Sequence, residues 1–247
     1  MKDISTKTIE DYLINRREKD KVARKTANTE LTALSGAFKY AVEMKYLREN
    51  PVKGIRRFPK KARKTPRFFD ENELKRIIES ETRPRYRDIW EFLAFTGLRK
   101  GELEHLEWPD VDFKNRVIHV RPKEDWEPKT KLSRTIPMHN RVYKILKERK
   151  KANESGRCVF VNDIGRPFKP DDLYSKLKPL LKRLGIEGNV HTFRHTFASH
   201  LVMAGVDLPT VASLLGHRDI STTMIYAHLA PEHLVNAVGK LSLQRCL

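Results

Sequence analysis

The sequence predicts a mainly α-helical protein of the α+β class, with one small antiparallel β-sheet. Over most of the chain, apolar residues recur at spacings of three and four, as on the buried face of a helix. Strand-like runs are concentrated between residues 111 and 137. A basic, proline-containing stretch near residue 60 interrupts the apolar pattern. We therefore expect a small helical domain at 1–58, a basic linker at 59–67 and a mostly helical domain carrying the sheet at 68–247.

The N-terminal domain is expected to hold two helices. Residues 8–17 place Ile9 and Leu13 on one face. A longer helix runs from about Thr29 and ends before Asn50-Pro51, because proline disfavours helical backbone in the residue that precedes it.

The larger domain opens with helices. Asp70 is a candidate N-cap, with Glu73 three residues later as its capping-box partner. A second helix over 87–96 is rich in aromatic residues, and Gly97 breaks it before a short helix at 100–106.

The sheet follows these helices. Residues 111–113 and 116–120 predict a β-hairpin, and residues 134–137 predict a third strand after a long polar stretch. From Asn140 onward the pattern is mainly helical, apart from a short apolar run at 158–161.

The composition favours a polyanionic partner. The formal net charge is +18 and the isoelectric point is near 9.9, a balance typical of nucleic-acid-binding proteins. The chain has no apolar run near the ~20 residues that span a bilayer. It starts without an apolar signal segment, and its two cysteines match neither zinc nor disulfide spacing. We expect a cytoplasmic, nucleoid-associated protein with no membrane partner.

The linker and the residues just before it hold a run of cations. A solvated linker is one interpretation; contact with the DNA backbone is the one we favour, because the run joins two units that would hold one ligand. The residues concerned are Arg56, Arg57, Lys60, Lys61, Arg63 and Lys64.

The C-terminal third brings together groups suited to phosphoryl transfer without a metal. Tyr226 follows His217 by nine residues, and the cluster 191–195 lies shortly upstream. A tyrosine, an arginine and imidazoles supply a nucleophile, a cation and proton-transfer groups. The sequence has no P-loop and no GxGxxG, so we expect no nucleotide cofactor. Zinc held by His191 and His195 is an alternative, but the Glu of HExxH and an obvious third ligand are missing.

Three motifs resemble those of the tyrosine recombinases, the family of phage integrases and Xer-type resolvases. The segment 96–103 (TGLRKGEL) is similar to their first arginine motif, and 191–198 (HTFRHTFA) is similar to their HxxR motif. Leu215-Gly216-His217, with Tyr226 nine residues after the histidine, resembles their last motif in content and spacing. The resemblance covers most of residues 70–240 and extends to the fold class.

The resemblance implies a role for each matching residue. Tyr226 would form a 3′-phosphotyrosyl bond to DNA, while Arg99 and Arg194 would clamp the scissile phosphate. His217 would donate a hydrogen bond to it, and His191 would accept a proton or position a neighbour. No metal and no cofactor would take part.

Three further residues follow from the same resemblance. The family's general-acid lysine usually lies eight residues before the proline that closes the second of two strands, which indicates Lys129, with Lys131 as a close rival. Glu102 resembles the acidic residue that orients the first arginine. His195 is expected to support packing rather than chemistry.

The resemblance is weaker at both ends. The N-terminal domain resembles only the later part of the family's helical core-binding domain, and we expect it to be shortened. Residues 231–243 predict an amphipathic helix that docks either on its own domain or on a neighbouring protomer.

The resemblance therefore implies a site-specific DNA recombinase that acts on double-stranded DNA, as a monomer in solution and a homotetramer on DNA. The alternatives are a type IB topoisomerase and a non-catalytic DNA-binding relative.

Overall fold

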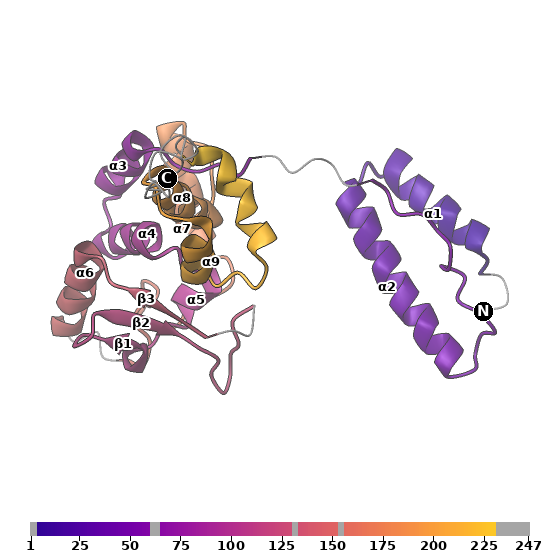
Figure 1. Ribbon diagram of the computed structural model, residues 1–247, viewed down its shortest axis with the longest axis horizontal. Helices are drawn as coiled ribbons and strands as arrows, with labels where there is room; N and C mark the ends of the chain where they lie inside the picture. Colours follow the sequence, from indigo (N-terminus) through magenta and orange to yellow (C-terminus); the bar gives the residue numbers. More distant parts are fainter. Residues whose placement is uncertain (1–3, 60–64, 130–132, 153–155, 231–247) are drawn as a thin grey trace, which may run out of the picture. The chain divides into compact units, whose positions relative to one another are not determined.

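The computed structural model describes residues 4–59, 65–129, 133–152 and 156–230 (Figure 1). The chain divides into two compact units, Met1–Lys64 and Thr65–Leu247. None of the helices in the described ranges combines the length and the apolar content needed to cross a bilayer.

The first unit is a pair of packed helices, α1 (Thr6–Glu18) and α2 (Arg24–Glu43). Its small core includes Ile9, Leu13 and Leu31. The predicted long helix has different bounds from those expected, since it begins five residues earlier and ends at Glu43 rather than near Asn50. The backbone leaves the helix at Lys45, whose φ of +58° is left-handed and incompatible with a continuing α-helix.

The second unit is mostly helical and carries a three-stranded antiparallel sheet, which confirms the predicted fold class. Its helices are α3 (Glu71–Ser80), α4 (Pro84–Thr96), α5 (Lys100–Glu104), α6 (Asn140–Lys151), α7 (Asp172–Leu184), α8 (Val190–Met203) and α9 (Leu208–Leu215), with short 3₁₀ helices η1 (Trp108–Asp110), η2 (Ile220–Thr222) and η3 (Met224–Leu229). The strands are β1 (Val111–Asp112), β2 (Val117–Val120) and β3 (Arg134–Pro137).

The sheet has the order β1-β2-β3 and places one apolar row in the core. Ile118 of β2 pairs with Val111 of β1 and with Ile136 of β3. All three side chains are buried and join the main hydrophobic cluster. The sheet therefore packs against the helical core through one face and carries β3, which begins next to the site described below.

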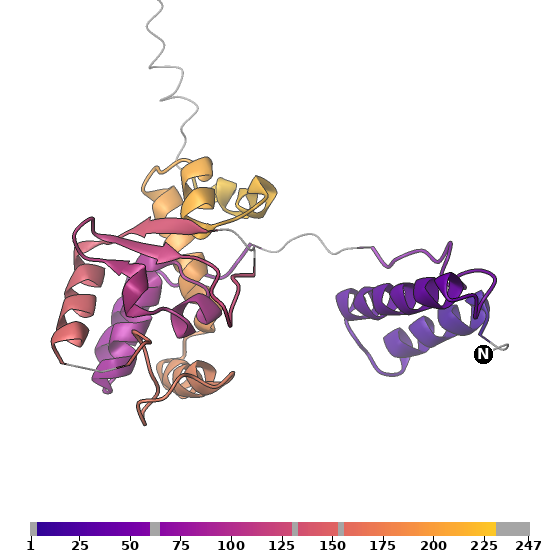
Figure 2. The same cartoon turned by 90° about the horizontal axis from the view of Figure 1, so that it is seen from below.

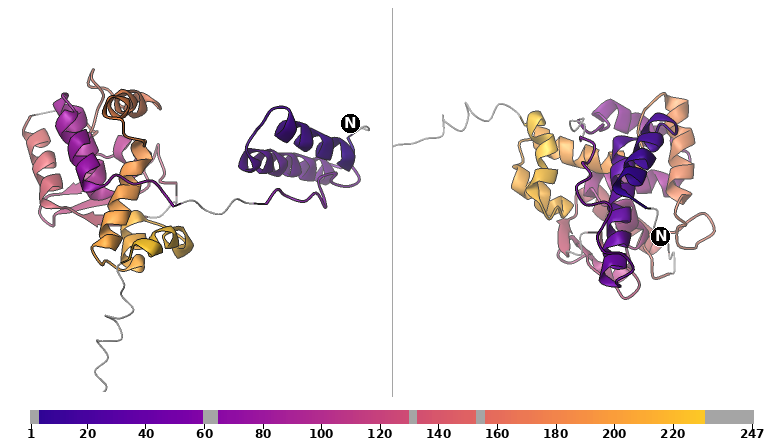
Figure 3. Two further views of the ribbon diagram at one scale, coloured as in Figure 1. Left: turned by 90° about the horizontal axis from the view of Figure 1, so that it is seen from above. Right: turned by 90° about the vertical axis from the view of Figure 1, so that its right-hand side faces the viewer.

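Helices α4 and α8 form the centre of this unit. The rings of Trp90 on α4 and Phe193 on α8 stack with centroids 5.7 Å apart, and Phe69 meets Phe193 edge-on at 5.0 Å. The η3 segment (yellow) lies beside α8 (orange) in Figures 2 and 3. Residues of η3 are thereby brought against the face of α8.

Two helix ends in the second unit agree with the sequence prediction. Asp70 caps α3 and Glu73 completes the capping box. Gly97 ends α4 with a φ of +61°, and a Cβ there would lie 2.4 Å from Cδ1 of Phe197. Only glycine fits this turn, which brings Arg99, two residues later, to the start of α5.

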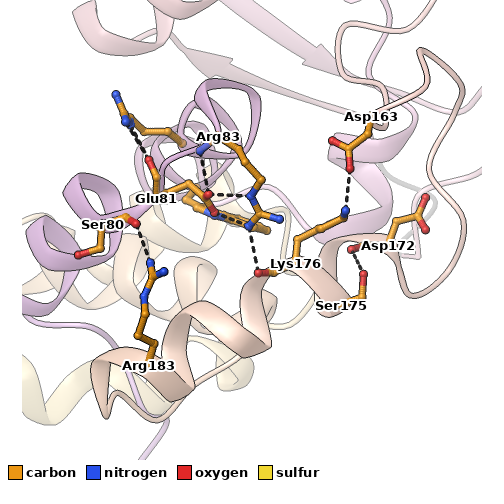
Figure 4. Close-up of polar contacts among 10 residues, drawn as sticks. Ser80, Glu81, Arg83, Asp163, Asp172, Ser175, Lys176 and Arg183 are labelled. Atoms are coloured by element: carbon orange, nitrogen blue, oxygen red, sulfur yellow. Dashed lines mark hydrogen bonds and ion pairs between the residues drawn. The ribbon is translucent and has the colours of Figure 1, made fainter.

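An ion pair with a buried carboxylate joins the α3–α4 connection to α7 (Figure 4). The Glu81 carboxylate accepts two hydrogen bonds of 2.8 Å from the Arg83 guanidinium and one of 3.1 Å from the Trp90 indole. Arg83 also donates to the Lys176 carbonyl on α7 at 3.3 Å. Burial alone would raise the pKa of Glu81, but the bonds from Arg83 and Trp90 outweigh it and lower the pKa.

Replacing Glu81 by Gln should lower the free energy of unfolding by about 1–2 kcal/mol, because the buried Trp90 donor and the partly exposed Arg83 lose a charged acceptor. Urea denaturation followed by circular dichroism measures this. Glu79→Gln is the matched control: its exposed pair with Lys75 spans 3.9 Å, and we expect a change below about 0.5 kcal/mol. Equal effects of the two substitutions would show that Glu81 does not hold this junction together.

Candidate active site

Five of the predicted site residues converge where α5, α8, the end of α9 and η3 meet. Arg99 is the N-cap of α5, His191 and Arg194 lie on α8, His217 follows α9, and Tyr226 lies in η3. Residues more than 120 positions apart in sequence thereby enter one site.

The Glu102 carboxylate is the centre of this arrangement. Its side chain is 1% exposed, and its Oε1 accepts a hydrogen bond of 2.8 Å from the Arg99 guanidinium. The Arg99 backbone amide donates to Oε2, also at 2.8 Å. Arg134 of β3 donates to both carboxylate oxygens, at 2.9 and 2.6 Å, and Nη1 of Arg194 lies 3.9 Å from Oε2. One anion thus fixes three cations.

The pKa of Glu102 reflects these partners. Burial alone would raise it, but the hydrogen bonds and charge of Arg134, the Arg99 amide and the charge of Arg194 together lower the pKa to about 2. The carboxylate is therefore ionised throughout the physiological range. With three guanidinium groups around one carboxylate, the cluster keeps a positive surplus that suits an incoming phosphate.

Arg194 is buried against two backbone carbonyls. Its guanidinium donates to the Gly97 carbonyl at 2.8 Å and to the Leu215 carbonyl at 2.5 Å. Burial and the charge of nearby Arg99 lower its pKa to about 9, which leaves it cationic at neutral pH. A cation that has lost its water in this way gains from binding an anion.

The two predicted histidines stand in the same electric field. Burial and the charges of Arg194 and Arg99 lower the pKa of His217 to about 4, and the same three influences lower the pKa of His191. Nδ1 of His217 lies 2.8 Å from the hydroxyl of Thr223, a residue with no exposed surface. Both imidazoles are therefore neutral in the free protein, and His217 is held in a defined orientation.

Tyr226 is buried, with 2% of its surface exposed, and its hydroxyl contacts a histidine. The partner is His195, whose Nδ1 lies 2.5 Å from the tyrosine oxygen. Burial raises the pKa of Tyr226 to about 12, against the opposing charge of Arg194. Burial, His191 and Arg194 lower the pKa of His195 to about 4. The sequence analysis expected His195 to support packing rather than chemistry and did not predict its contact with the Tyr226 hydroxyl.

Lys129 lies in a turn before β3 and is exposed. Its charge is one of the causes that lower the pKa of His191, so the lysine stands within electrostatic range of the site. Its rival Lys131 lies outside the described residues.

Of the predicted DNA contacts before and within the linker, Arg56 and Arg57 are exposed in the first unit. The other four, Lys60, Lys61, Arg63 and Lys64, lie outside the described residues. The described residues hold no group of three or more His, Cys, Asp or Glu side chains that could bind a metal ion.

Arg134 is a site residue that the sequence analysis missed. Besides its paired bonds to Glu102, its Nε donates to the Leu214 carbonyl at 2.9 Å. Gly216, with a φ of +66°, makes room for it, because a Cβ there would lie 2.8 Å from Cδ of Arg134. The available signal was an arginine at the start of the strand that ends in Pro137, but its partner is 32 positions away.

The chain matches the phage integrase family over residues 67–233. A tyrosine recombinase XerC-like protein of Caldanaerobacter subterraneus subsp. tengcongensis is 33% identical, with the match covering 83% of this chain and 62% of that protein. A tyrosine recombinase of Thermosipho africanus is 32% identical over 87% of this chain and 76% of its own length. This chain therefore spans less than two thirds of the first relative.

Solved structures show the same fold. The Tn1549 transposon integrase in complex with a circular intermediate DNA has a TM-score of 0.78 at 23% identity, covering 97% of this chain and 86% of that one. The catalytic domain of bacteriophage HP1 integrase has a TM-score of 0.55 at 29% identity, covering 72% of this chain and 96% of that domain.

Two glutamates of α5 should differ in how their replacement by glutamine changes the free energy of unfolding. The pKa of Glu102 lies far below the ordinary 4.5, so its ionised form stabilises the fold above about pH 4.5, and this contribution is lost as the pH falls toward 2. Glu102→Gln should cost about 3 kcal/mol or more at neutral pH, because three guanidinium groups lose their anion.

Glu104 provides the matched control on the same helix. Burial raises its pKa to about 7, against the charge of Lys100, so its ionisation destabilises the fold as the pH rises from 4.5 through 7. Glu104→Gln should leave stability unchanged or raise it at mildly alkaline pH. Urea denaturation of both variants across this pH range measures the effect, and a loss of stability in both would contradict the assignment.

Proposed function

We propose, because this chain belongs to the phage integrase family of tyrosine recombinases, that it cleaves and rejoins DNA at a specific site through a 3′-phosphotyrosyl intermediate. The observation that carries this proposal is the convergence of Arg99, Arg194, His191 and His217 with one tyrosine, Tyr226, beside them. Cleavage of a phosphodiester requires such groups, which neutralise charge on the phosphate, donate hydrogen bonds to it and supply a nucleophile.

In the proposed reaction the Tyr226 oxygen attacks the scissile phosphorus and the bond to the 5′-oxygen breaks. Arg99 and Arg194 neutralise the nonbridging oxygens, His217 donates a hydrogen bond to one of them, and Lys129 gives a proton to the leaving 5′-oxygen. The phosphotyrosyl bond conserves the energy of the broken diester. An incoming 5′-hydroxyl can therefore reseal the strand without a nucleotide or a metal.

We propose double-stranded DNA as the partner. The Tn1549 integrase noted above is a DNA complex, and the +18 charge supports the same partner here. On the first unit, a hollow of about 1010 Å³ is lined by several cations, among them Arg17, Arg24, Lys25 and Arg57. We propose that this surface and the basic linker contact the phosphate backbone.

We further propose a monomer in solution and a homotetramer on two duplexes, in a cytoplasmic, nucleoid-associated protein. The predicted docking helix at 231–243 lies outside the described residues. The molar mass of the purified DNA complex, measured by light scattering, tests the assembly: two duplexes with four chains support it, and one duplex with one chain would contradict it. The relatives noted above carry recombinase names, and nothing favours the topoisomerase or the non-catalytic alternative.

Tyr226→Phe should abolish the covalent adduct with DNA, because phenylalanine has no oxygen to attack the phosphorus. The probe is a pool of nicked duplexes with randomised sequence. After cleavage the short fragment with the 5′-hydroxyl diffuses away, so religation cannot occur and the covalent adduct accumulates. Tyr86→Phe is the matched control, since Tyr86 is equally buried and lies in the main hydrophobic cluster, outside the proposed site. Adduct formation by the Tyr226 variant would refute the assignment, and sequencing the trapped DNA identifies the site.

A sulfur-substituted substrate should separate Lys129 from Lys131 as the general acid. Lys129→Ala should slow cleavage by about 10²-fold or more, and a 5′-bridging phosphorothiolate should restore it, because a thiolate leaves without protonation. Lys131→Ala should cleave the ordinary duplex at near the wild-type rate. If instead Lys131→Ala is slow and is rescued by the phosphorothiolate, Lys131 is the general acid. If the phosphorothiolate rescues neither variant, neither lysine is the general acid.

A further inference from the structure

The contact between Tyr226 and His195 identifies a residue for which the mechanism above has no role. The 2.5 Å separation of Nδ1 and the hydroxyl oxygen is at the short end of hydrogen bonds that involve a hydroxyl. The two rings come from elements 31 positions apart in sequence, α8 and η3. His195 is therefore part of the surroundings of the proposed nucleophile and not of the phosphate clamp.

The protonation of both partners allows Tyr226 to donate this bond. Tyr226 keeps its proton at neutral pH because burial raises its pKa to about 12, and His195 is neutral because burial and nearby positive charge lower its pKa to about 4. A neutral imidazole has one nitrogen free to accept a hydrogen bond. In the tautomer that carries its proton on Nε2, Nδ1 of His195 accepts from the tyrosine hydroxyl, and the proposal below uses this tautomer.

Burial makes such an acceptor necessary. With 2% of Tyr226 exposed and Nδ1 of His195 at 2.5 Å, the histidine is the acceptor best placed to take its hydroxyl proton. As the bond from oxygen to phosphorus forms, the hydroxyl becomes strongly acidic, so even a weak base can take the proton. The phosphate also brings negative charge beside Arg194 and His191, the groups that depress the basicity of His195.

Building on the proposed function, we propose that His195 is a catalytic residue that accepts the Tyr226 proton during cleavage and returns it during religation. In cleavage, the bond from the Tyr226 oxygen to phosphorus forms and the bond from phosphorus to the 5′-oxygen breaks. The tyrosine proton moves to Nδ1 of His195, and Lys129 protonates the 5′-oxygen. Religation reverses each transfer, so protons and charge balance over the cycle.

The ionisable groups that face His195 come from two elements. On its own helix these are His191, whose ring centroid lies 4.8 Å away, and Arg194; from η3 it is Tyr226. Helix α9, which also packs on α8, has no ionisable side chain. On the other neighbours of α8, the ionisable side chains of α4 include Glu91, which pairs with Arg141, and those of α7 include Lys176, which pairs with Asp163.

The test measures adduct formation in a single turnover at saturating protein, on a nicked duplex carrying the sequence trapped from the randomised pool. His195→Asn places an amide oxygen close to the position of Nδ1, so it keeps a hydrogen-bond acceptor but removes the base. We expect wild-type DNA affinity and a cleavage rate lower by about 10²-fold. Cleavage within about threefold of the wild-type rate would overturn the proposal.

Chemical rescue separates a base from a space-filling ring. His195→Ala should be equally slow, and added imidazole should restore its rate by about tenfold or more, whereas the similarly sized but far less basic pyrazole should not. Equal rescue by both compounds, or by neither, would overturn the proton-transfer role.

His200→Ala is the matched control on the same helix. Its Nε2 lies 3.0 Å from the Phe69 carbonyl, away from the site. His200 is half-buried, as His195 is. We expect it to cleave at the wild-type rate even if its thermal midpoint falls. The proposed function fails separately, if the wild-type protein forms no adduct or if the adduct does not depend on Tyr226.

Discussion

The Glu102 carboxylate holds three guanidinium groups, from α5, β3 and α8, within 4 Å of itself, and the rest of the site depends on it. Without that anion, Arg99, Arg134 and Arg194 would repel one another in a region from which water is largely excluded. The carboxylate offsets only part of the positive charge. The cluster is therefore stable enough to exist before a phosphate arrives and remains cationic enough to bind one.

The ends of two helices also stabilise the positive charge of this cluster. Arg194 donates to the carbonyls of Gly97 and Leu215, at the C-termini of α4 and α9, where the helix dipole concentrates negative charge. Both helices end in a left-handed glycine, and a Cβ at either Gly97 or Gly216 would collide with a neighbouring side chain. Fold and electrostatics thus meet at the same turns: the glycines that stop the helices expose the carbonyls that hold the cation.

The sequence predicted the fold class, all three strands near their observed bounds and the helix ends at Asp70 and Gly97, because capping residues, glycine breaks and β-branched runs act locally. The predicted bounds of α2 were wrong. Its C-terminal end is followed by Lys45 in a left-handed conformation, and no glycine or proline there marks the end of the helix in the sequence. The sequence prediction also missed Arg134 and the contact of His195 with Tyr226. Those pairings join residues 32 and 31 positions apart, and no local pattern records which partner a side chain meets after folding.

Neutral histidines follow from the same positive field, and they decide what each ring can do. His217 can donate from Nε2 to a phosphate only if its Nδ1 accepts, and the fully buried Thr223 hydroxyl, 2.8 Å away, is placed to donate that bond. A cationic His217 would make Thr223 an acceptor instead and add charge to a site already crowded with it. The lowered histidine pKa values therefore leave each ring with one nitrogen that can accept. Under the proposed function, His217 accepts from Thr223 and donates to the phosphate, and His195 accepts from Tyr226.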